Sequence, residues 1–162
     1  MWSNIALILY KTILVPHAGT PAGDEALKHA IYAAEEISEI IILHIVEAIH
    51  APPSFALSSS EREKLLEDVH KANEEIRKDM KQKMKQYDQQ CKEKGVESKV
   101  KVEIGDAAEI ILNTVEKEKV ELIVMSKRRK LKGLKKLLSL GSVSRKIVEN
   151  ASCPVLLLDI EK

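Results

Sequence analysis

Hydrophobic residues along the chain gather in short, nearly continuous runs, and these alternate with longer segments that keep a single apolar face. Residues 39–46 are nearly all apolar and β-branched, which is typical of a strand covered on both sides. Residues 20–37 instead begin with Thr20 as an N-cap and Pro21 at the first helical position, and their apolar residues share one helical face. The pattern predicts strands at 10–16, 39–46, 97–104, 121–125 and 154–159, and helices at 20–37, 60–94, 107–117 and 142–150.

Strands that alternate with helices along the whole chain predict an α/β fold, a doubly wound five-stranded parallel sheet. Residues 97–104 differ from the other strands because polar and apolar positions alternate, so we expect an edge strand that is wet on one face. Asp106 is expected to cap the helix that follows this strand. No repeat or linker interrupts residues 10–162, and we expect a single domain there.

The segment from Ser60 to Lys94 is expected to be one long polar helix. Ser60 begins the sequence Ser-Glu-Arg-Glu, which predicts a capping box with Glu63, and Gly95 would end the helix as a left-handed cap. One apolar stripe runs along it, and its mixed members favour packing on the sheet over a coiled coil. The stripe consists of Leu65, Val69, Ala72, Ile76, Met80, Met84, Tyr87 and Cys91.

Composition adds little until charge is followed along the chain. Hydrophobic residues make up 44% and charged residues 31%, as in ordinary soluble proteins, and the net charge is +1. Residues 127–146, however, hold nine cations and no acid, which leaves 17 cations against 25 acids, a net −8, elsewhere. One basic patch on a nearly neutral protein favours a local anion over a nucleic acid, and the 3% of aromatic residues offers no stacking platform for bases.

The ends and the cysteines favour a cytoplasmic protein. Residues 1–9 are apolar, but they lack a charged n-region and are too short to span a bilayer, so we interpret them as an extension that packs on the domain or on a partner. Cys91 and Cys153 have neither a metal-ligand spacing nor a disulfide framework, and we expect reduced thiols.

A ligand crevice is expected where the winding of the sheet reverses, beyond the carboxyl ends of the strands. With a central first strand, the loop at 17–20 would face the loop at 126–142, and Ile45 would flank the first loop. This arrangement combines an apolar wall, a basic loop and a helix start at Gly141-Ser142, which suit a base, a ribose and phosphates. Free backbone N–H groups and the helix dipole at such a start favour a phosphate.

Groups that could perform catalysis are sparse. His17 lies at the mouth of the crevice and could act as a general base, but no second catalytic group has a usable spacing, and a turn histidine is the preferred interpretation. His44 lies in an apolar strand and is expected to be a core histidine. No paired carboxylates, nucleophile elbow or phosphate-binding Walker loop is present. A slow nucleotide hydrolase is the most that an enzyme hypothesis would allow.

From Tyr10 to Ile160 the chain resembles the universal stress protein family. The resemblance is carried by Tyr-Lys-Thr-Ile-Leu-Val-Pro at 10–16, Ile-Ile-Leu-His-Ile-Val at 41–46, Gly-Asp-Ala-Ala-Glu-Ile-Ile at 105–111, Gly-Ser-Val-Ser-Arg-Lys-Ile-Val at 141–148 and Cys-Pro-Val-Leu-Leu-Leu at 153–158.

The resemblance implies a Rossmann-like fold of the adenine nucleotide alpha hydrolase-like type, with strand order 3-2-1-4-5. It also implies a small stress-response protein that binds ATP or another adenine nucleotide, with or without Mg²⁺. It implies a homodimer, and we expect antiparallel pairing of two copies of the Pro154–Leu158 strand. The nucleotide would contact Pro16, Ala18, Ile45, Met125, Ser126, Arg129, Gly141, Ser142, Val143 and Ser144.

The chain departs from the family at the phosphate loop. Nucleotide-binding members carry Gly-x2-Gly-x9-Gly-Ser/Thr, whereas Ser126 and Arg129 occupy the first two glycine positions here and eleven residues separate Arg129 from Gly141. Ala18 replaces the acid that contacts the nucleoside. Side chains of Lys127, Arg128 and Arg129 could compensate, or this segment could be a solvated run of charge. The alternative hypothesis is therefore a dimeric interaction protein with a degenerate loop that does not bind ATP.

Overall fold

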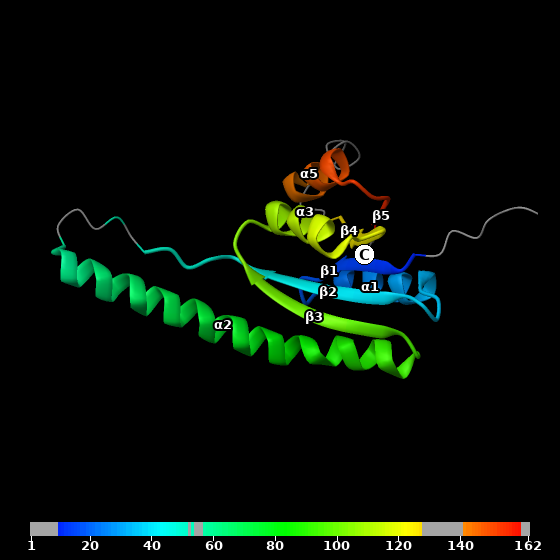
Figure 1. The fold of residues 1–162 in the computed structure, drawn as a ribbon, viewed down its shortest axis with the longest axis horizontal. Helices are drawn as coiled ribbons and strands as arrows, with labels where there is room; N and C mark the ends of the chain where they lie inside the picture. Colours follow the sequence, from blue (N-terminus) through cyan, green and yellow to red (C-terminus); the bar gives the residue numbers. More distant parts are fainter. Residues whose placement is uncertain (1–9, 52, 54–56, 128–140, 160–162) are drawn as a thin grey trace, which may run out of the picture.

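The computed structural model describes residues 10–51, 53, 57–127 and 141–159. These residues form five strands and four helices that alternate along the chain, as predicted (Figure 1). The N-terminal extension at 1–9 and Arg129 lie outside the described residues. The strands are β1 (Thr12–Pro16), β2 (Glu39–Val46), β3 (Glu97–Ile104), β4 (Leu122–Ser126) and β5 (Val155–Leu158), and the helices are α1 (Pro21–Ala33), α2 (Ser59–Glu93), α3 (Ala107–Glu118) and α5 (Ser142–Asn150).

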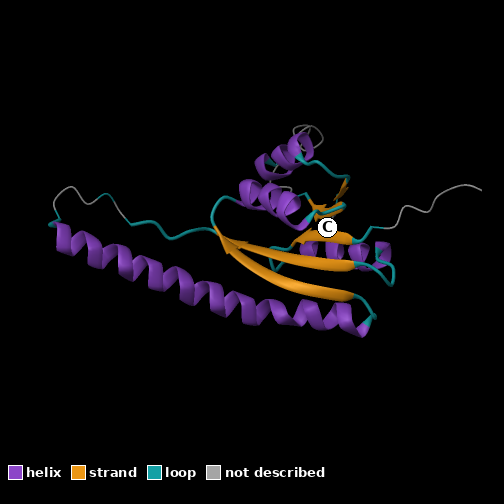
Figure 2. Ribbon diagram, in the orientation of Figure 1, coloured by secondary structure: helices purple, strands orange, loops and turns teal. Residues whose placement is uncertain are grey.

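The sheet is entirely parallel, with strand order β3-β2-β1-β4-β5 (Figure 2). This confirms the doubly wound fold and places β3 at an edge. β1 is central, because Thr12 pairs with Glu39 of β2 on one side and Ile13 pairs with Leu122 of β4 on the other. The order reverses between β1 and β4, so their carboxyl ends border the crevice that such a sheet provides for a ligand.

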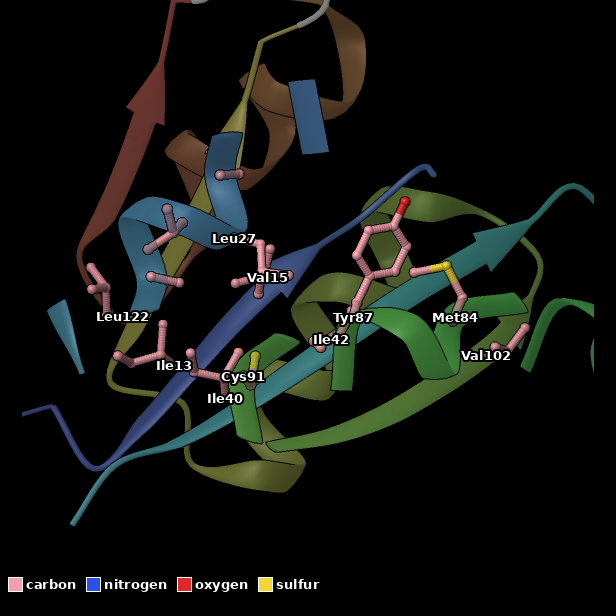
Figure 3. Packing of buried hydrophobic residues seen from close by; sticks show 13 residues of the cluster. Ile13, Val15, Leu27, Ile40, Ile42, Met84, Tyr87, Cys91, Val102 and Leu122 are labelled. Atoms are coloured by element: carbon pink, nitrogen blue, oxygen red, sulfur yellow. The ribbon is translucent and has the colours of Figure 1, made fainter. Parts of the chain in front are cut away.

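Helices cover both faces of the sheet, and each face has its own hydrophobic core. Successive residues of a strand point to opposite faces, so Ile13 and Val15 belong to one core while Leu14 belongs to the other. The first core packs under α1 and α2, which contribute Leu27, Met84, Tyr87 and Cys91 (Figure 3). The second core, under α3 and α5, contains Leu14, Ile41, Leu43, Ile111, Val115, Val120, Ile123, Met125 and Ile147.

Helix α1 is shorter than predicted. It ends at Ala33 rather than near Ile37, which is 57% exposed. The Ser38 hydroxyl accepts a hydrogen bond from the Glu35 N–H at 2.9 Å and donates one to the Tyr10 carbonyl at 2.5 Å. These bonds fix a turn that leads directly into β2, so the apolar periodicity continues past the true end of the helix.

Helix α2 is a single helix, as expected, but its cap is Ser58 rather than Ser60. The Ser58 hydroxyl accepts from the Glu61 N–H, and the Glu61 carboxylate accepts from the Ser58 N–H at 2.9 Å, which completes a capping box. The buried residues of α2 all lie in its last third, and its N-terminal half extends beyond the sheet (Figure 1). Gly95 ends the helix with a φ of 75°, and Asp106 caps α3 through the Glu109 N–H at 2.9 Å, both as predicted.

The polar face of β3 carries a cluster of partly exposed ion pairs. Lys99 Nζ lies 2.9 Å from Glu39 and 3.0 Å from Glu118 of α3, and Lys101 also pairs with Glu118. Glu97 and Glu103 on the same face of the strand are exposed, as expected for an edge strand that is wet on one face. Cys91 and Cys153 are free thiols, as predicted. Among the described residues, no helix combines the length and the apolar character that a membrane crossing requires.

Candidate functional site

A cleft of about 250 Å³ opens at the carboxyl ends of the strands, where the strand order reverses. Its walls come from both sides of the reversal: the ends of β1, β2 and β4, and the first turns of α1, α3 and α5. Most of the lining is apolar, with a few polar groups, as is usual for small-molecule sites. The lining residues are Pro16, His17, Ala18, Thr20, Ala22, Gly23, Leu43, Ile45, Ala107, Ile111, Met125, Ser126, Val143 and Ser144.

One wall of the cleft is the turn that joins β1 to α1. It is fixed from β2, because the His17 N–H donates to the Leu43 carbonyl at 2.8 Å, and Nδ1 of the buried His44 lies 2.8 Å from the His17 carbonyl. His44 is therefore a hydrogen-bonded core histidine, as predicted. At the other end of the turn, the Thr20 hydroxyl accepts from the Gly23 N–H and caps α1.

The side chain of His17 lies under this turn, away from solvent. The residue is 1% exposed, and its ring centroid lies 4.0 Å from that of Tyr87 on α2. Nδ1 accepts a hydrogen bond from the Gly19 N–H at 3.0 Å. Nε2 lies 3.2 Å from Oδ1 of Asp24, but the orientation does not meet hydrogen-bond geometry, and neither atom has a hydrogen-bond partner among the described residues.

Burial lowers the pKa of His17 below the ordinary value of 6.5, and the neighbouring His44 acts in the same direction. The nearby carboxylate of Asp24 opposes both effects without reversing them. Burial, and to a smaller extent the same carboxylate, raise the pKa of Tyr87. His17 is therefore a neutral, buried ring at neutral pH, with Nδ1 as an acceptor, and this arrangement does not suit a general base that must reach a ligand.

The opposite end of the cleft is polar and is formed by β4 and α5. Ser126 is half-buried at the end of β4, and Val143 and Ser144 line the cleft from the first turn of α5. Gly141 is the N-cap of α5 and supplies no side-chain hydrogen bond. Among the described residues, no side chain caps the first N–H groups of this helix, and a helix N-terminus in this condition favours an anion.

Lys127 does not serve the cleft as the sequence allowed. Its Nζ lies 2.8 Å from Oδ2 of Asp159, and its N–H donates to the Leu158 carbonyl at 2.9 Å. The ion pair ties the end of β4 to the end of β5 and directs the charge of Lys127 to that carboxylate. In this structure Lys127 therefore does not compensate for the missing glycines.

Seven of the ten residues assigned from the sequence line one cleft: Pro16, Ala18, Ile45, Met125, Ser126, Val143 and Ser144. Gly141 and Ser142 begin α5 beside the cleft without lining it, and Arg129 lies outside the described residues. Sequence reasoning missed Ala107 and Ile111 of α3. The position of α3 directly after the edge strand gave no sign that it reaches the point of reversal.

Within the described residues, no group of three or more His, Cys, Asp or Glu side chains has the arrangement of a metal site. The polar groups that line the cleft are hydroxyls, backbone groups and the buried imidazole of His17. This set of groups can hold a small molecule by shape and hydrogen bonds. It does not form a nucleophile–base pair.

Comparison with known proteins gives a consistent family. The model of the universal stress protein family matches residues 9–159. The chain is 31% identical to universal stress protein MJ0531 of Methanocaldococcus jannaschii, over 93% of this chain and 82% of that protein. It is 30% identical to universal stress protein YxiE of Bacillus subtilis, over 93% of this chain and 99% of that protein.

Solved structures share the fold at lower sequence identity. The hypothetical protein MJ0577 superposes with a TM-score of 0.76 at 23% identity, covering 96% of this chain and 99% of that one. A universal stress protein in complex with cAMP gives 0.57 at 16% identity, covering 94% and 98%. A universal stress protein family protein from Arabidopsis thaliana with AMP bound gives 0.55 at 20% identity, covering 93% and 92%.

Proposed function

This chain belongs to the universal stress protein family, and from that premise we propose that it is a small cytosolic stress-response protein that binds an adenine nucleotide, ATP or AMP. The nucleotide would occupy the cleft between the loops after β1 and β4. The observation that carries the proposal is the convergence, at the point of strand reversal, of an apolar pocket and an uncapped helix start. Relatives of the same fold with cAMP and AMP bound support the ligand class.

The apolar side of the cleft fits a base. Pro16, Ala18 and Ile45 offer apolar side chains to a planar base, and Met125 continues this surface toward β4. At the Ala18 position the family acid is absent, so the nucleoside would be held by apolar contact and by backbone groups of the turn. We expect the affinity for the nucleoside alone to be modest, because a buried charged hydrogen bond contributes more than a neutral one.

The phosphates would lie toward the start of α5. Ser126, Val143 and Ser144 border this end, with Gly141 and Ser142 next to it, and their N–H groups and the helix dipole favour negative charge. Arg129 is proposed as a further phosphate contact because of its place in the loop sequence. Mg²⁺ would accompany ATP through the phosphates, since the described residues offer no metal-ligand cluster of their own.

A second candidate function rests on the phosphate loop. Two of its glycine positions are Ser126 and Arg129, and these residues lack the backbone freedom that lets a loop wrap phosphates closely. In this case the protein would act as a dimeric interaction or regulatory protein without ATP. For either function we propose a homodimer through β5, whose position at the sheet edge leaves it available for strand pairing.

Calorimetric titration of the folded protein with ATP and AMP, each with and without Mg²⁺, tests the first function. Ile45→Trp should abolish binding, because the larger side chain would fill the apolar end of the cleft. Ile49→Trp is the matched control, since Ile49 is 44% exposed and does not line the cleft. Ser142→Ala and Arg129→Ala test the phosphate end of the cleft. Each should weaken the binding of ATP more than the binding of adenosine.

The outcomes separate the two functions. Heat from ATP or AMP that is lost in Ile45→Trp and kept in Ile49→Trp supports the nucleotide site. The absence of heat with every nucleotide, on protein whose circular dichroism is native, rejects this site and favours the interaction protein. Turnover of ATP during the titration would support the slow hydrolase, which we otherwise set aside because the described residues of the cleft include no base–nucleophile pair.

A further inference from the structure

A buried histidine, His17, holds the turn that forms one wall of the cleft. The protonation state of its ring decides whether the ring can hold this turn. Gly19, in the middle of the turn, has a φ of 69° and donates its N–H to Nδ1 of His17 at 3.0 Å. A ring nitrogen accepts a hydrogen bond only when it carries no proton. The geometry therefore requires the tautomer in which Nε2, on the side of Asp24, carries the hydrogen.

We infer that His17 is a positioning residue of the ligand cleft: its unprotonated Nδ1 holds the 18–20 turn against the ligand, and protonation of the ring releases the turn. The inference deepens the proposed nucleotide function and rests on it for the ligand. Protonation would place an N–H at Nδ1 against the N–H of Gly19, two donors with no acceptor between them. The turn would have to move, and with it Ala18 and Thr20, which line the cleft.

The surroundings of the ring make this response specific. The ionisable groups that face it are Asp24 of α1, His44 of β2 and Tyr87 of α2. Asp24 lies 3.2 Å from Nε2 and would pair with an imidazolium there, so the charged ring has a partner on the helix side and a conflict on the turn side. Protonation of the ring is therefore expected to move the turn, rather than to be prevented altogether by the surroundings of the ring. Burial keeps the pKa of His17 below 6.5, so the neutral ring prevails at neutral pH.

Gly23 belongs to the same arrangement. A Cβ atom at this position would lie 2.9 Å from Cε1 and Nδ1 of His17, so the first turn of α1 packs directly on the ring. The ring therefore contacts both ends of the wall, the Gly19 amide and the start of α1. A ligand that rests on this wall should favour the neutral form of His17, and protons and ligand should compete.

Two variants of His17 separate the effect of its hydrogen bond with the Gly19 N–H from the effect of its protonation. In His17→Asn the side-chain oxygen can accept from the N–H two residues on, as in an Asx-turn, but it does not titrate. In His17→Leu neither property remains. We expect His17→Asn to bind AMP at pH 7.5 within about threefold of the wild type, and His17→Leu to bind at least about tenfold more weakly, because the Gly19 N–H then loses the acceptor that orders the turn.

The pH profile between 7.5 and 5.0 is the decisive measurement. Wild-type affinity should fall by up to about tenfold for each pH unit below the pKa of His17, by linkage. AMP itself titrates near pH 6, as phosphate monoesters do, so each variant is compared with the wild type on the same ligand, and adenosine serves as the probe without a phosphate. The His17→Asn profile should be flat with adenosine. A slope in His17→Asn equal to that of the wild type overturns the inference.

A measurement without ligand separates this inference from the proposed function. The Gly19 amide resonance should shift with pH in the wild type along the same curve as the His17 ring, and should not do so in His17→Asn. If neither a nucleotide nor adenosine binds at any pH, the nucleotide function fails. The pH dependence of the Gly19 amide resonance then decides alone whether His17 positions the turn. If AMP binds but the Gly19 amide resonance does not follow the titration of His17, the proposed nucleotide function stands and the inference fails.

Discussion

Gly23 packs directly against the imidazole of His17, with space for a hydrogen and none for a methyl group, since a Cβ would lie 2.9 Å from two ring atoms. In an open helix, Gly→Ala would stabilise by about 0.5–1 kcal/mol. Here overpacking should exceed this gain, because an extra methyl group in a filled core costs about 1–3 kcal/mol. We predict that Gly23→Ala lowers the free energy of unfolding by about 1 kcal/mol, measured by urea denaturation.

The control is the double variant with His17→Ala, which removes the ring that the new methyl group would meet. Gly23→Ala should be neutral or stabilising in this background, so that a double-mutant cycle gives a coupling energy of about 1 kcal/mol or more. Equal destabilisation in both backgrounds would mean that the contact with His17 is not the cause.

The Ser58 cap leads to a local prediction. α2 is buried only in its last third, so loss of its N-cap should fray the helix start and leave global stability almost unchanged. Ser58→Ala should cost the first turns about 1 kcal/mol and speed amide exchange there about fivefold. Ser60→Ala is the matched control, because the Ser60 hydroxyl lies 3.3 Å from that of Ser58 but Ser60 is not the N-cap. Faster exchange in Ser60→Ala than in Ser58→Ala would contradict the assignment.

Much of the fold could be predicted because the central strands are continuous apolar runs, such as residues 40–43, that only a doubly covered sheet explains. The helix boundaries were less certain, for physical reasons. The sequence at 58–63 satisfies the capping pattern twice, as Ser58 with Glu61 and as Ser60 with Glu63, and only the path of the incoming chain decides between them.

The cleft could be predicted in part, because the ends of β1, β2 and β4 must meet where the strand order reverses. The role of His17 could not. Its burial depends on Tyr87, 70 residues along the chain on α2, and its ring is directed by the Gly19 amide. Nothing in the local sequence His-Ala-Gly-Thr distinguishes a ring that points under the turn from one that points into the crevice.

The ion pairs between β3 and α3 predict a pH-dependent stability. Hydrogen bonds from Lys101 and then Lys99 lower the pKa of Glu118. A carboxylate with a lowered pKa stabilises the fold above its unfolded-state pKa, and this stabilisation is lost as the pH falls through the lower, folded value. Glu118→Gln should therefore cost up to about 1 kcal/mol at pH 7, since the pairs are partly exposed, and progressively less below pH 4.5.

Urea denaturation at pH 7 and pH 3 measures this difference, and 1 M salt should reduce it at pH 7. Glu103→Gln is the control, because Glu103 is exposed on β3, the strand that carries Lys99 and Lys101. A cost of Glu118→Gln that stays constant from pH 7 to pH 3 would show that packing, rather than charge, accounts for the effect.

The open edge of β5 carries the prediction about assembly. The carbonyls of Pro154 and Leu158 accept hydrogen bonds from Ile123 of β4 and from Lys127 directly after β4. Residues 154, 156 and 158 therefore direct their backbone groups toward β4, and residues 155 and 157 direct theirs to the open edge. Two β5 strands paired in antiparallel fashion about Leu156 would bring the two Leu156 side chains together. Leu156 is 40% exposed, so a polar replacement should be tolerated by the single chain.

Leu156→Glu should therefore turn a dimer into a monomer, because two like charges across an antiparallel pair are destabilising. Static light scattering and sedimentation at micromolar concentration measure this change, with circular dichroism to confirm the fold. Ile37→Glu is the control, since Ile37 is 57% exposed in the turn before β2, away from the β5 edge, and should leave the dimer intact. A wild-type monomer at these concentrations rejects the dimer, and a Leu156→Glu dimer places its interface on another surface.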